Sequence, residues 1–183
     1  GTVYSGSGHG GQGGAGSDAG GIAGKTYGNS NAPLAPGSGN RWGSGTTYGA
    51  EITSGGGSVQ LRVAGSLTLL GVMTADGAIG GVNYRGGSSG GSIYLTCRTF
   101  IGSSTALVQA NGGNGHYYGT PPVATGGGGG GGGRIAVWRV SDTSTGPVSN
   151  SAAGGLGYNA TNAASGTIVW GWLPSAGTVI RFR

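Results

Sequence analysis

Glycine recurs so densely along this chain that a helix of ordinary length has almost nowhere to form. The sequence holds 49 glycines in 183 residues, and almost no window of a dozen residues lacks one. Each glycine inside a helix costs about 0.5–1 kcal/mol relative to alanine. The longest window without glycine, Arg134–Thr145, is rich in β-branched residues and is followed by Gly-Pro. The sequence therefore predicts an all-β protein without helix.

The rest of the composition excludes the usual glycine-rich classes. Collagen is excluded because glycine does not recur at every third position and only six prolines are present. Disorder is disfavoured, since charged residues make up 7% of the chain and hydrophobic residues 35%, whereas disordered chains are highly charged. The length indicates a single domain over residues 1–183, with a Gly-rich N-terminal part at 1–57, a repeat core at 58–140 and C-terminal strands at 141–183. The chain begins at Gly1 without methionine, which suggests a processed or excised chain.

Two segments of the core resemble each other, residues 58–77 and residues 92–112, whose starts lie 34 residues apart (92 − 58). Apolar residues occupy alternate positions in both, and Asp-Gly or Asn-Gly stands at the far end, where it is typical of a tight turn. A weaker third copy begins at Arg134 after a run of eight glycines. The predicted strand runs are Val59–Val63 and Leu67–Thr74 in the first copy, and Ile93–Cys97 and Ala106–Ala110 in the second.

Strand copies at a fixed period favour stacked coils, in which like residues lie above one another. Val59, Ile93 and Ile135 would then form one apolar ladder, and Leu61, Leu95 and Val137 a second. The predicted fold is a Gly-rich β-solenoid, similar to a parallel β-helix, with long Gly-rich loops that are partly polyproline II. Cys97 matches Val63 on the inward side of its strand, so we expect a buried thiol.

These repeats resemble glycine-rich surface and secreted proteins of bacteria, on the segments "GGSIYLT", "ANGGNG" and "GGGGGGGRIAV" over roughly residues 37–140. That resemblance implies a right-handed parallel β-helix and carries no catalytic residues. The chain also resembles the glycine-rich tip adhesins of some phages, in which polyproline-II strands form a layered sandwich. The run Gly126–Gly133 suits this alternative, because only glycine lets backbones pack so closely.

No motif indicates an enzyme or a cofactor site. The stretch Ala19–Thr26 fits a relaxed phosphate-loop pattern, but no buried strand precedes it and prolines and glycines follow where the helix should begin. Asp18, Glu51, Asp76 and Asp142, the four acidic residues, form no evident catalytic pair. With two histidines and one cysteine, they make no metal-ligand cluster either. We expect no enzyme activity, no cofactor and no metal.

The net charge of +5 comes mainly from arginines that alternate with apolar residues, so they should point outward from strands. We expect no nucleic-acid partner, and an anionic polysaccharide is a secondary candidate. No run of 18 apolar residues is present, so no membrane-spanning segment is expected.

The function that follows is an extracellular structural subunit of a self-assembling fibre or matrix, and the alternative is a glycan-binding adhesin module. Both ends of the chain are β-prone and lack an obvious cap, which favours head-to-tail polymers. The candidate assembly residues are Thr2, Val3, Tyr4, Val179, Ile180, Arg181 and Phe182. The candidate glycan contacts are Tyr84, Tyr117 and Tyr118.

Overall fold

The computed structural model describes residues 4–17, 21–41, 52–81, 85–118 and 125–175, and every regular element in these ranges is a β-strand. The prediction of an all-β chain is confirmed for this part of the molecule. The strands are β1 (Asn40–Arg41), β2 (Ile52–Thr53), β3 (Ser58–Leu69), β4 (Val72–Thr74), β5 (Ser92–Gly102), β6 (Leu107–Gln109), β7 (Tyr117–Tyr118), β8 (Thr125–Gly126), β9 (Arg134–Asp142), β10 (Ser149–Ser151) and β11 (Thr167–Trp172).

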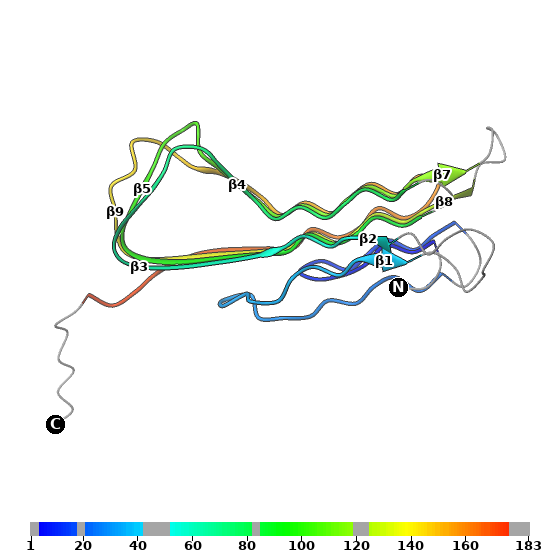
Figure 1. The fold of residues 1–183 in the computed structure, drawn as a ribbon, viewed down its shortest axis with the longest axis horizontal. Helices are drawn as coiled ribbons and strands as arrows, with labels where there is room; N and C mark the ends of the chain where they lie inside the picture. The colour runs from blue at the N-terminus through cyan, green and yellow to red at the C-terminus, as the bar shows by residue number, and fades with distance from the viewer. Residues whose placement is uncertain (1–3, 18–20, 42–51, 82–84, 119–124, 176–183) are drawn as a thin grey trace, which may run out of the picture.

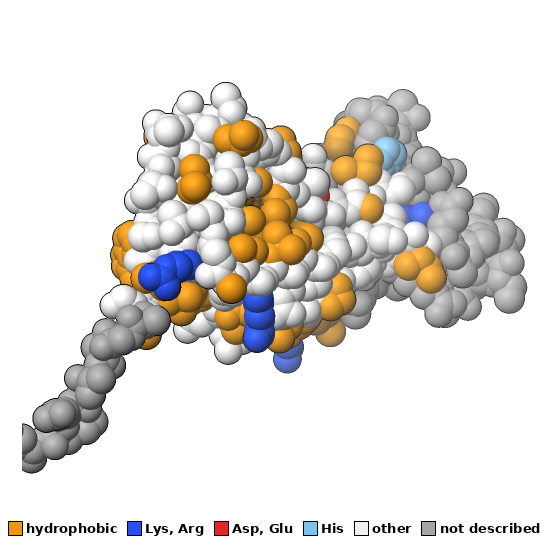
Figure 2. Space-filling model, turned by 60° about the vertical axis from the view of Figure 1, so that its left-hand side comes forward, with side chains coloured by type: hydrophobic (Ala, Val, Ile, Leu, Met, Phe, Trp, Pro, Cys, Tyr) orange, Lys and Arg blue, Asp and Glu red, His pale blue; other side chains and the backbone are white. Residues whose placement is uncertain are grey.

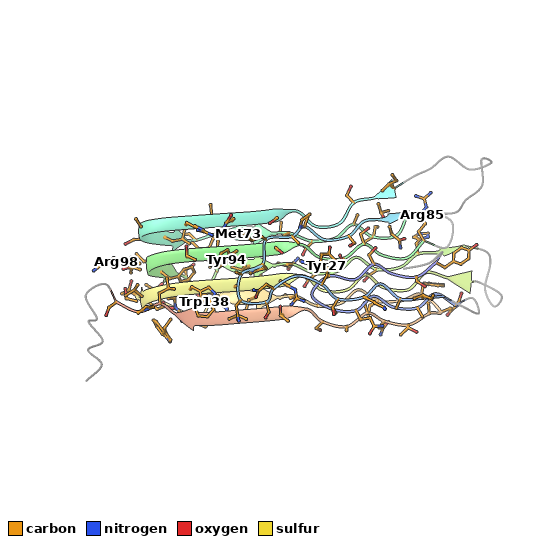
Figure 3. All side chains as sticks on the ribbon, turned by 90° about the horizontal axis from the view of Figure 1, so that it is seen from below. Tyr27, Met73, Arg85, Tyr94, Arg98 and Trp138 are labelled. Atoms are coloured by element: carbon orange, nitrogen blue, oxygen red, sulfur yellow. The ribbon has the colours of Figure 1, made fainter. Side chains whose placement is uncertain are left out.

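Two parallel sheets form one end of the elongated molecule. The larger sheet has the order β11-β9-β5-β3 and the smaller one the order β10-β6-β4. The chain runs out along a strand of the larger sheet, turns, and returns along a strand of the smaller one (Figure 1). Seen from below, β3, β5, β9 and β11 lie side by side in that order (Figure 3). We call these out-and-back passes the first layer (β3–β4), the second layer (β5–β6) and the third layer (β9–β10), with β11 beyond the third.

The stacking of like residues predicted from the repeat is confirmed by the strand register. Val59 pairs with Ile93, which pairs with Ile135, and Leu61 pairs with Leu95, which pairs with Val137. The ladders extend to β11, where Ile168 and Trp170 add a fourth rung to each. Except for Ile168, which is exposed, these side chains belong to the hydrophobic core, so the apolar alternation of the strands builds one shared core.

The strand ends differ from the prediction. Leu67–Leu69 belongs to the same strand as Val59–Val63, because β3 continues to Leu69 across a register shift between Val63 and Ser66. The chain turns only after Leu69, and the returning strand β4 is short. The Asp-Gly and Asn-Gly pairs form no turn. Asp76 Oδ1 accepts the Asn111 N–H (2.6 Å), and Asn111 Oδ1 accepts the Ala153 N–H (2.8 Å), so these side chains bond one layer to the next.

The remaining half of the molecule is a bundle of extended glycine-rich segments with segment 127–133 at its centre. The N–H groups along this segment point to three neighbours in turn, with the direction repeating every third residue. Gly127, Gly130 and Gly133 donate to segment 110–116, Gly128 and Gly131 to segment 4–7, and Gly129 and Gly132 to segment 161–164. A period of three residues without internal hydrogen bonds is that of a polyproline-II helix.

The carbonyl groups of the same segment bond three further neighbours. Gly126, Gly129 and Gly132 accept from segment 11–17, Gly127 and Gly130 from segment 155–158, and Gly128 and Gly131 from segment 87–90. An added Cβ at any residue from Gly126 to Gly133 would lie less than 3 Å from a neighbouring backbone atom. Glycine is therefore required for close approach on all sides and not for backbone freedom, since Gly28 is the one described glycine with positive φ (81°).

The predicted β-solenoid is wrong. The strands form two separate parallel sheets of four and three strands, and β11 has no counterpart in the smaller one. A solenoid wall bonds each segment to the coil above and the coil below, whereas segment 127–133 bonds to neighbours on six sides. Residues 4–17 lie against this segment and complete the bundle (Figure 1). The glycine-rich stretches are thus the buried interior, where loops had been expected, because chains without side chains can pack in three dimensions.

Candidate functional site

The first layer is an open end of the stack. Its strand β3 is the edge of the larger sheet, and its strand β4 is the edge of the smaller one. Val59, Leu61 and Val63 are only half-buried, while their partners Ile93 and Leu95 in the second layer are fully buried. The difference arises because the second layer has strands on both sides and the first layer on one. An edge strand of this length presents a row of unpaired backbone groups.

Large apolar side chains are also exposed on this layer and on the segments that precede and follow it in the chain. Four of them have exposed fractions of 65–67%: Ile52, Leu70, Val72 and Ile79. The space-filling view, which looks toward the turn end and the β3–β4 side, shows hydrophobic side chains gathered on this surface (Figure 2). Such a cluster at an open sheet edge is typical of an interaction surface.

A second feature is a pocket of about 250 Å³ at the turn end, between the β9–β10 connection and β11. Its apolar wall is formed by Phe100, Pro147, Val148 and Trp170. Phe100 meets Trp170 edge to face, with ring centroids 5.3 Å apart and an interplanar angle of 82°. The polar groups of the wall are Asp142, Ser144 and Asn150.

Asp142 is held in place by several charge-assisted bonds. Its Oδ2 accepts from Arg139 Nε (2.7 Å), and its Oδ1 accepts from the Ser144 N–H (3.1 Å) and hydroxyl (2.6 Å). Burial alone would raise the pKa of Asp142, but the Ser144 bonds and the Arg139 charge outweigh it and lower that pKa. Arg139 also lies over two tryptophan rings, with its Cζ 5.1 Å from the ring centroid of Trp170 and 4.2 Å from that of Trp172. The carboxylate thus stays ionised, fixed and charge-compensated at neutral pH.

A third feature is a buried histidine beside a buried arginine inside the bundle. His9 is fully buried, and its Nδ1 lies 2.8 Å from the Gly90 carbonyl oxygen. A carbonyl only accepts hydrogen bonds, so Nδ1 carries the proton of the neutral ring, and the buried Nε2 has no partner among the described residues. Arg134, 8% exposed, donates to the Tyr27 carbonyl oxygen (2.9 Å) and to Thr167 Oγ1 (3.0 Å).

Burial lowers the pKa of the His9 imidazole, and the nearby Arg134 charge lowers it further, against the bond to Gly90. Burial likewise lowers the pKa of the Arg134 guanidinium. The Tyr27 ring packs against the imidazole, with ring centroids 4.7 Å apart, and supplies no carboxylate that could stabilise a protonated imidazole. His9 is therefore a neutral core residue that acid would force to ionise.

We expect the protein to lose stability as the pH falls below about 6.5, the ordinary pKa of histidine. The unfolded chain binds the proton there while folded His9 does not, so the free energy of unfolding declines with pH. Urea unfolding at pH 7.5 and pH 5 measures the loss. His9→Asn keeps a donor for Gly90 but does not titrate, and it should show a much smaller pH dependence. Equal pH dependence in both proteins would contradict the assignment, since His116 is unchanged in the variant.

The residues proposed from the sequence are only partly described. Tyr4 lies at the edge of the bundle with φ 66°, and its carbonyl accepts the Gly128 N–H (2.8 Å). Tyr117 and Tyr118 form β7, which pairs antiparallel with β8. The other candidates, Thr2, Val3, Tyr84, Val179, Ile180, Arg181 and Phe182, lie outside the described residues. The assembly and glycan assignments of all these residues remain predictions.

The residues weighed for catalysis and metal binding are not brought together. Asp18 and Glu51 lie outside the described residues, and the Asp76 carboxylate accepts hydrogen bonds from the Gln109 side-chain amide and the Asn111 N–H. Within the described ranges, no group of three or more His, Cys, Asp or Glu residues could hold a metal ion. Lys25 is exposed beside Gly24, whose N–H and carbonyl bond to Gly6 and Gly13 within the bundle.

Cys97 is 2% exposed, as the match with Val63 predicted, and burial raises the pKa of its thiol. Arg62 and Arg98 are exposed on their strands, also as predicted. In the described ranges, no helix is long and apolar enough to cross a membrane.

The sequence reasoning missed the aromatic pocket. Phe100, Asp142 and Trp170 come from three different strands, and no motif joins them. The signal that could have found Trp170 is the match of "GTIVWGW" to the third copy, which would have placed it above Val137 in the second ladder.

In comparisons with known proteins, no family model, no curated protein and no solved structure matches this chain.

Proposed function

We propose that this chain is a non-enzymatic structural protein of the extracellular space that assembles with copies of itself, and that the first layer is an assembly contact. The observation that carries the proposal is β3, a strand of twelve residues with an open edge and a half-covered apolar row. A second copy would pair with the free backbone groups and bury that row. The extracellular placement rests on the resemblance to secreted glycine-rich proteins.

Symmetric pairing of two first layers fits better than stacking of a first layer on the far end of another copy. The far edge strand β11 has six residues, half the length of β3, so it would leave much of β3 unpaired. The hydrogen bonds from side-chain oxygens to the next layer also end at that side. Asp76 and Asn111 supply these oxygens in the first and second layers, and the third layer has Ala153 at the matching place, which has no side-chain acceptor. Two copies of β3 match in length by definition, and such two-fold contacts are the commonest in proteins.

A fibre requires a second contact in addition to this pair. The terminal segments, residues 1–5 and 178–183, remain the proposal for it, because head-to-tail contacts propagate. Deleting Thr178–Arg183 should then leave the pair through the first layer intact and shorten any polymer seen by electron microscopy.

Two matched substitutions test the first-layer contact. Ile79 and Leu156 are 65% and 60% exposed on the returning segments of the first and third layers, so both face solvent on opposite sides of the stack. Ile79→Lys places like charges across the two-fold contact, and we expect sedimentation velocity to show monomers where the wild type shows dimers. Leu156→Lys should leave association unchanged.

Other outcomes would correct the proposal in defined ways. If both substitutions abolish association, the copies stack first layer to far end. If the wild-type chain stays monomeric at high concentration, the self-assembly proposal fails and the adhesin takes its place.

The adhesin module is the second candidate because the described residues on either side of several connections lie at one end of the bundle (Figure 1). The chain leaves β7 at Tyr118 and re-enters β8 at Thr125 at the end opposite the turns, and β1 and β2 lie toward that same end (Figure 1). A bundle whose strand ends lie together at one end is a suitable platform for binding. Loss of glycan adhesion in Tyr117→Ser and Tyr118→Ser, with unchanged folding, would support this candidate.

A further inference from the structure

The pocket at the turn end combines two kinds of wall that recognise one class of ligand. Phe100, Val148 and Trp170 supply an apolar wall, and Asp142, Ser144 and Asn150 supply hydrogen-bonding groups. We propose that this pocket binds a neutral sugar ring. Nothing in the self-assembly proposal requires it, and it would give the adhesin candidate a specific ligand class at the end opposite β7.

The apolar wall suits a pyranose ring. One face of such a ring presents C–H groups, which pack against aromatic side chains, while its rim carries hydroxyls. Trp170 is fixed for this task by its edge-to-face contact with Phe100 and by the Arg139 guanidinium over its ring. A pocket of about 250 Å³ is slightly below the range of drug-sized sites and accommodates a single ring.

The polar groups suit the hydroxyls of the rim. Asp142 is held by Arg139 and Ser144, so its carboxylate is positioned before a ligand arrives. Asp142 Oδ1 already accepts two hydrogen bonds from Ser144, whereas Oδ2 accepts one from Arg139 and can accept a second from a sugar hydroxyl. The Asn150 amide is exposed on the edge strand β10, with one N–H directed to the Val148 carbonyl (3.2 Å), which leaves its other N–H and its oxygen available.

The charge of the pocket selects a neutral ligand. Asp142 is the one ionisable group among the lining residues, and it lies 24% exposed at the wall. The compensating Arg139 is turned toward Asp142 and covered by the rings of Trp170 and Trp172. A sugar carboxylate would be repelled by Asp142 without gaining the arginine. The pocket therefore favours neutral over anionic saccharides, although the net charge of the whole chain is +5.

The test is a titration of the ¹⁵N-labelled full chain, followed by NMR, with the methyl glycosides of glucose, galactose, mannose and N-acetylglucosamine, each up to about 50 mM, a range that detects millimolar affinity. We expect at least one of them to shift the Trp170 indole and Asn150 side-chain amide signals saturably. Glucuronic acid should bind at least about tenfold more weakly.

Two variants make the assignment specific to this pocket. Asn150→Ala should weaken binding by about fivefold or more, which is about 1 kcal/mol. Ser149→Ala should leave affinity unchanged, because Ser149 is exposed next to Asn150 on the same strand β10 but does not line the pocket. Circular dichroism checks that both variants fold.

Three results would overturn the proposal: no shift with any of the four neutral probes, a shift that does not involve Trp170 and Asn150, or equal loss of affinity in the two variants. Sedimentation of the same samples reports association separately, so failure of the sugar site and failure of the self-assembly proposal can be told apart.

Discussion

Gly130→Ala is expected to prevent folding, or to lower the free energy of unfolding by at least about 4 kcal/mol, the size reached only by severe lesions. Gly130 lies in the central segment of the bundle, and its N–H and carbonyl bond to Gly113 and Gly155. An added methyl would lie within 3 Å of backbone atoms of Gly87 and Ser88. Backbone cannot rotate away as a side chain can, so the collision must separate segments that are fixed by hydrogen bonds on six sides.

Gly57→Ala is the matched control. Gly57 also lies in an extended segment, and its carbonyl accepts the Ser92 N–H (3.0 Å), but an added Cβ would meet nothing within 4 Å. Because alanine restricts the unfolded chain, this substitution should leave stability unchanged or raise it by up to about 1 kcal/mol. Urea unfolding followed by circular dichroism measures both variants. Similar stability of the two variants would show that the backbones around Gly130 are not in close contact.

The strands of the two sheets were predictable from the sequence because their apolar side chains alternate with period two. Val59, Ile93 and Ile135 recur at matching places in strands with period-two alternation, and this determines both the register and the inward face. Cys97 could be placed for the same reason, since its counterpart in the first copy, Val63, is apolar and lies on the inward side of its strand.

The bundle was not predictable from the same reasoning, because glycine has no side chain that marks an inside or an outside. Segment 127–133 takes its structure from backbone bonds to six segments, and those bonds leave no periodic signal in the sequence. The tight turns predicted at Asp76 and Asn111 were wrong because the residue type alone does not show what its oxygen bonds to. Both are common turn residues, yet here their oxygens replace a backbone acceptor between adjacent layers.

The candidate sites follow the same division. If the repeats stack in the order of the sequence, the first copy is expected to form an edge of the sheet. The structure has β3 at that edge. The pocket could not be inferred in this way, since it depends on how the β9–β10 connection folds beside Trp170. His9 lies in a Gly-rich stretch of the kind for which loops were predicted, and its burial follows from the bundle that the sequence did not reveal.

Leu95→Ala is expected to lower the free energy of unfolding by about 2–5 kcal/mol, as large-to-small changes in a packed core do. Leu95 is fully buried in the second layer, between Leu61 below and Val137 above. Strands on both sides keep the site from collapsing, so the cavity stays open. Chemical denaturation of the dilute monomer measures the loss, and a cost below about 1 kcal/mol would mean that the two ladders are not closely packed.

Leu61→Ala at the same rung of the first layer should cost the monomer only about 1 kcal/mol, because its side chain is half-buried and the open edge leaves no enclosed cavity. Assembly changes this expectation in a specific way. If two first layers pair, Leu61 becomes an interior rung in the dimer, and its removal weakens association as well as folding. Binding of a second copy stabilises the folded state, and by mass action the gain grows with protein concentration. The loss of unfolding free energy caused by Leu61→Ala should therefore rise with concentration, because this variant also weakens the dimer. The loss caused by Leu95→Ala should change less. A cost of Leu61→Ala that is independent of concentration, in a range where the wild type associates, would place the contact elsewhere on the molecule.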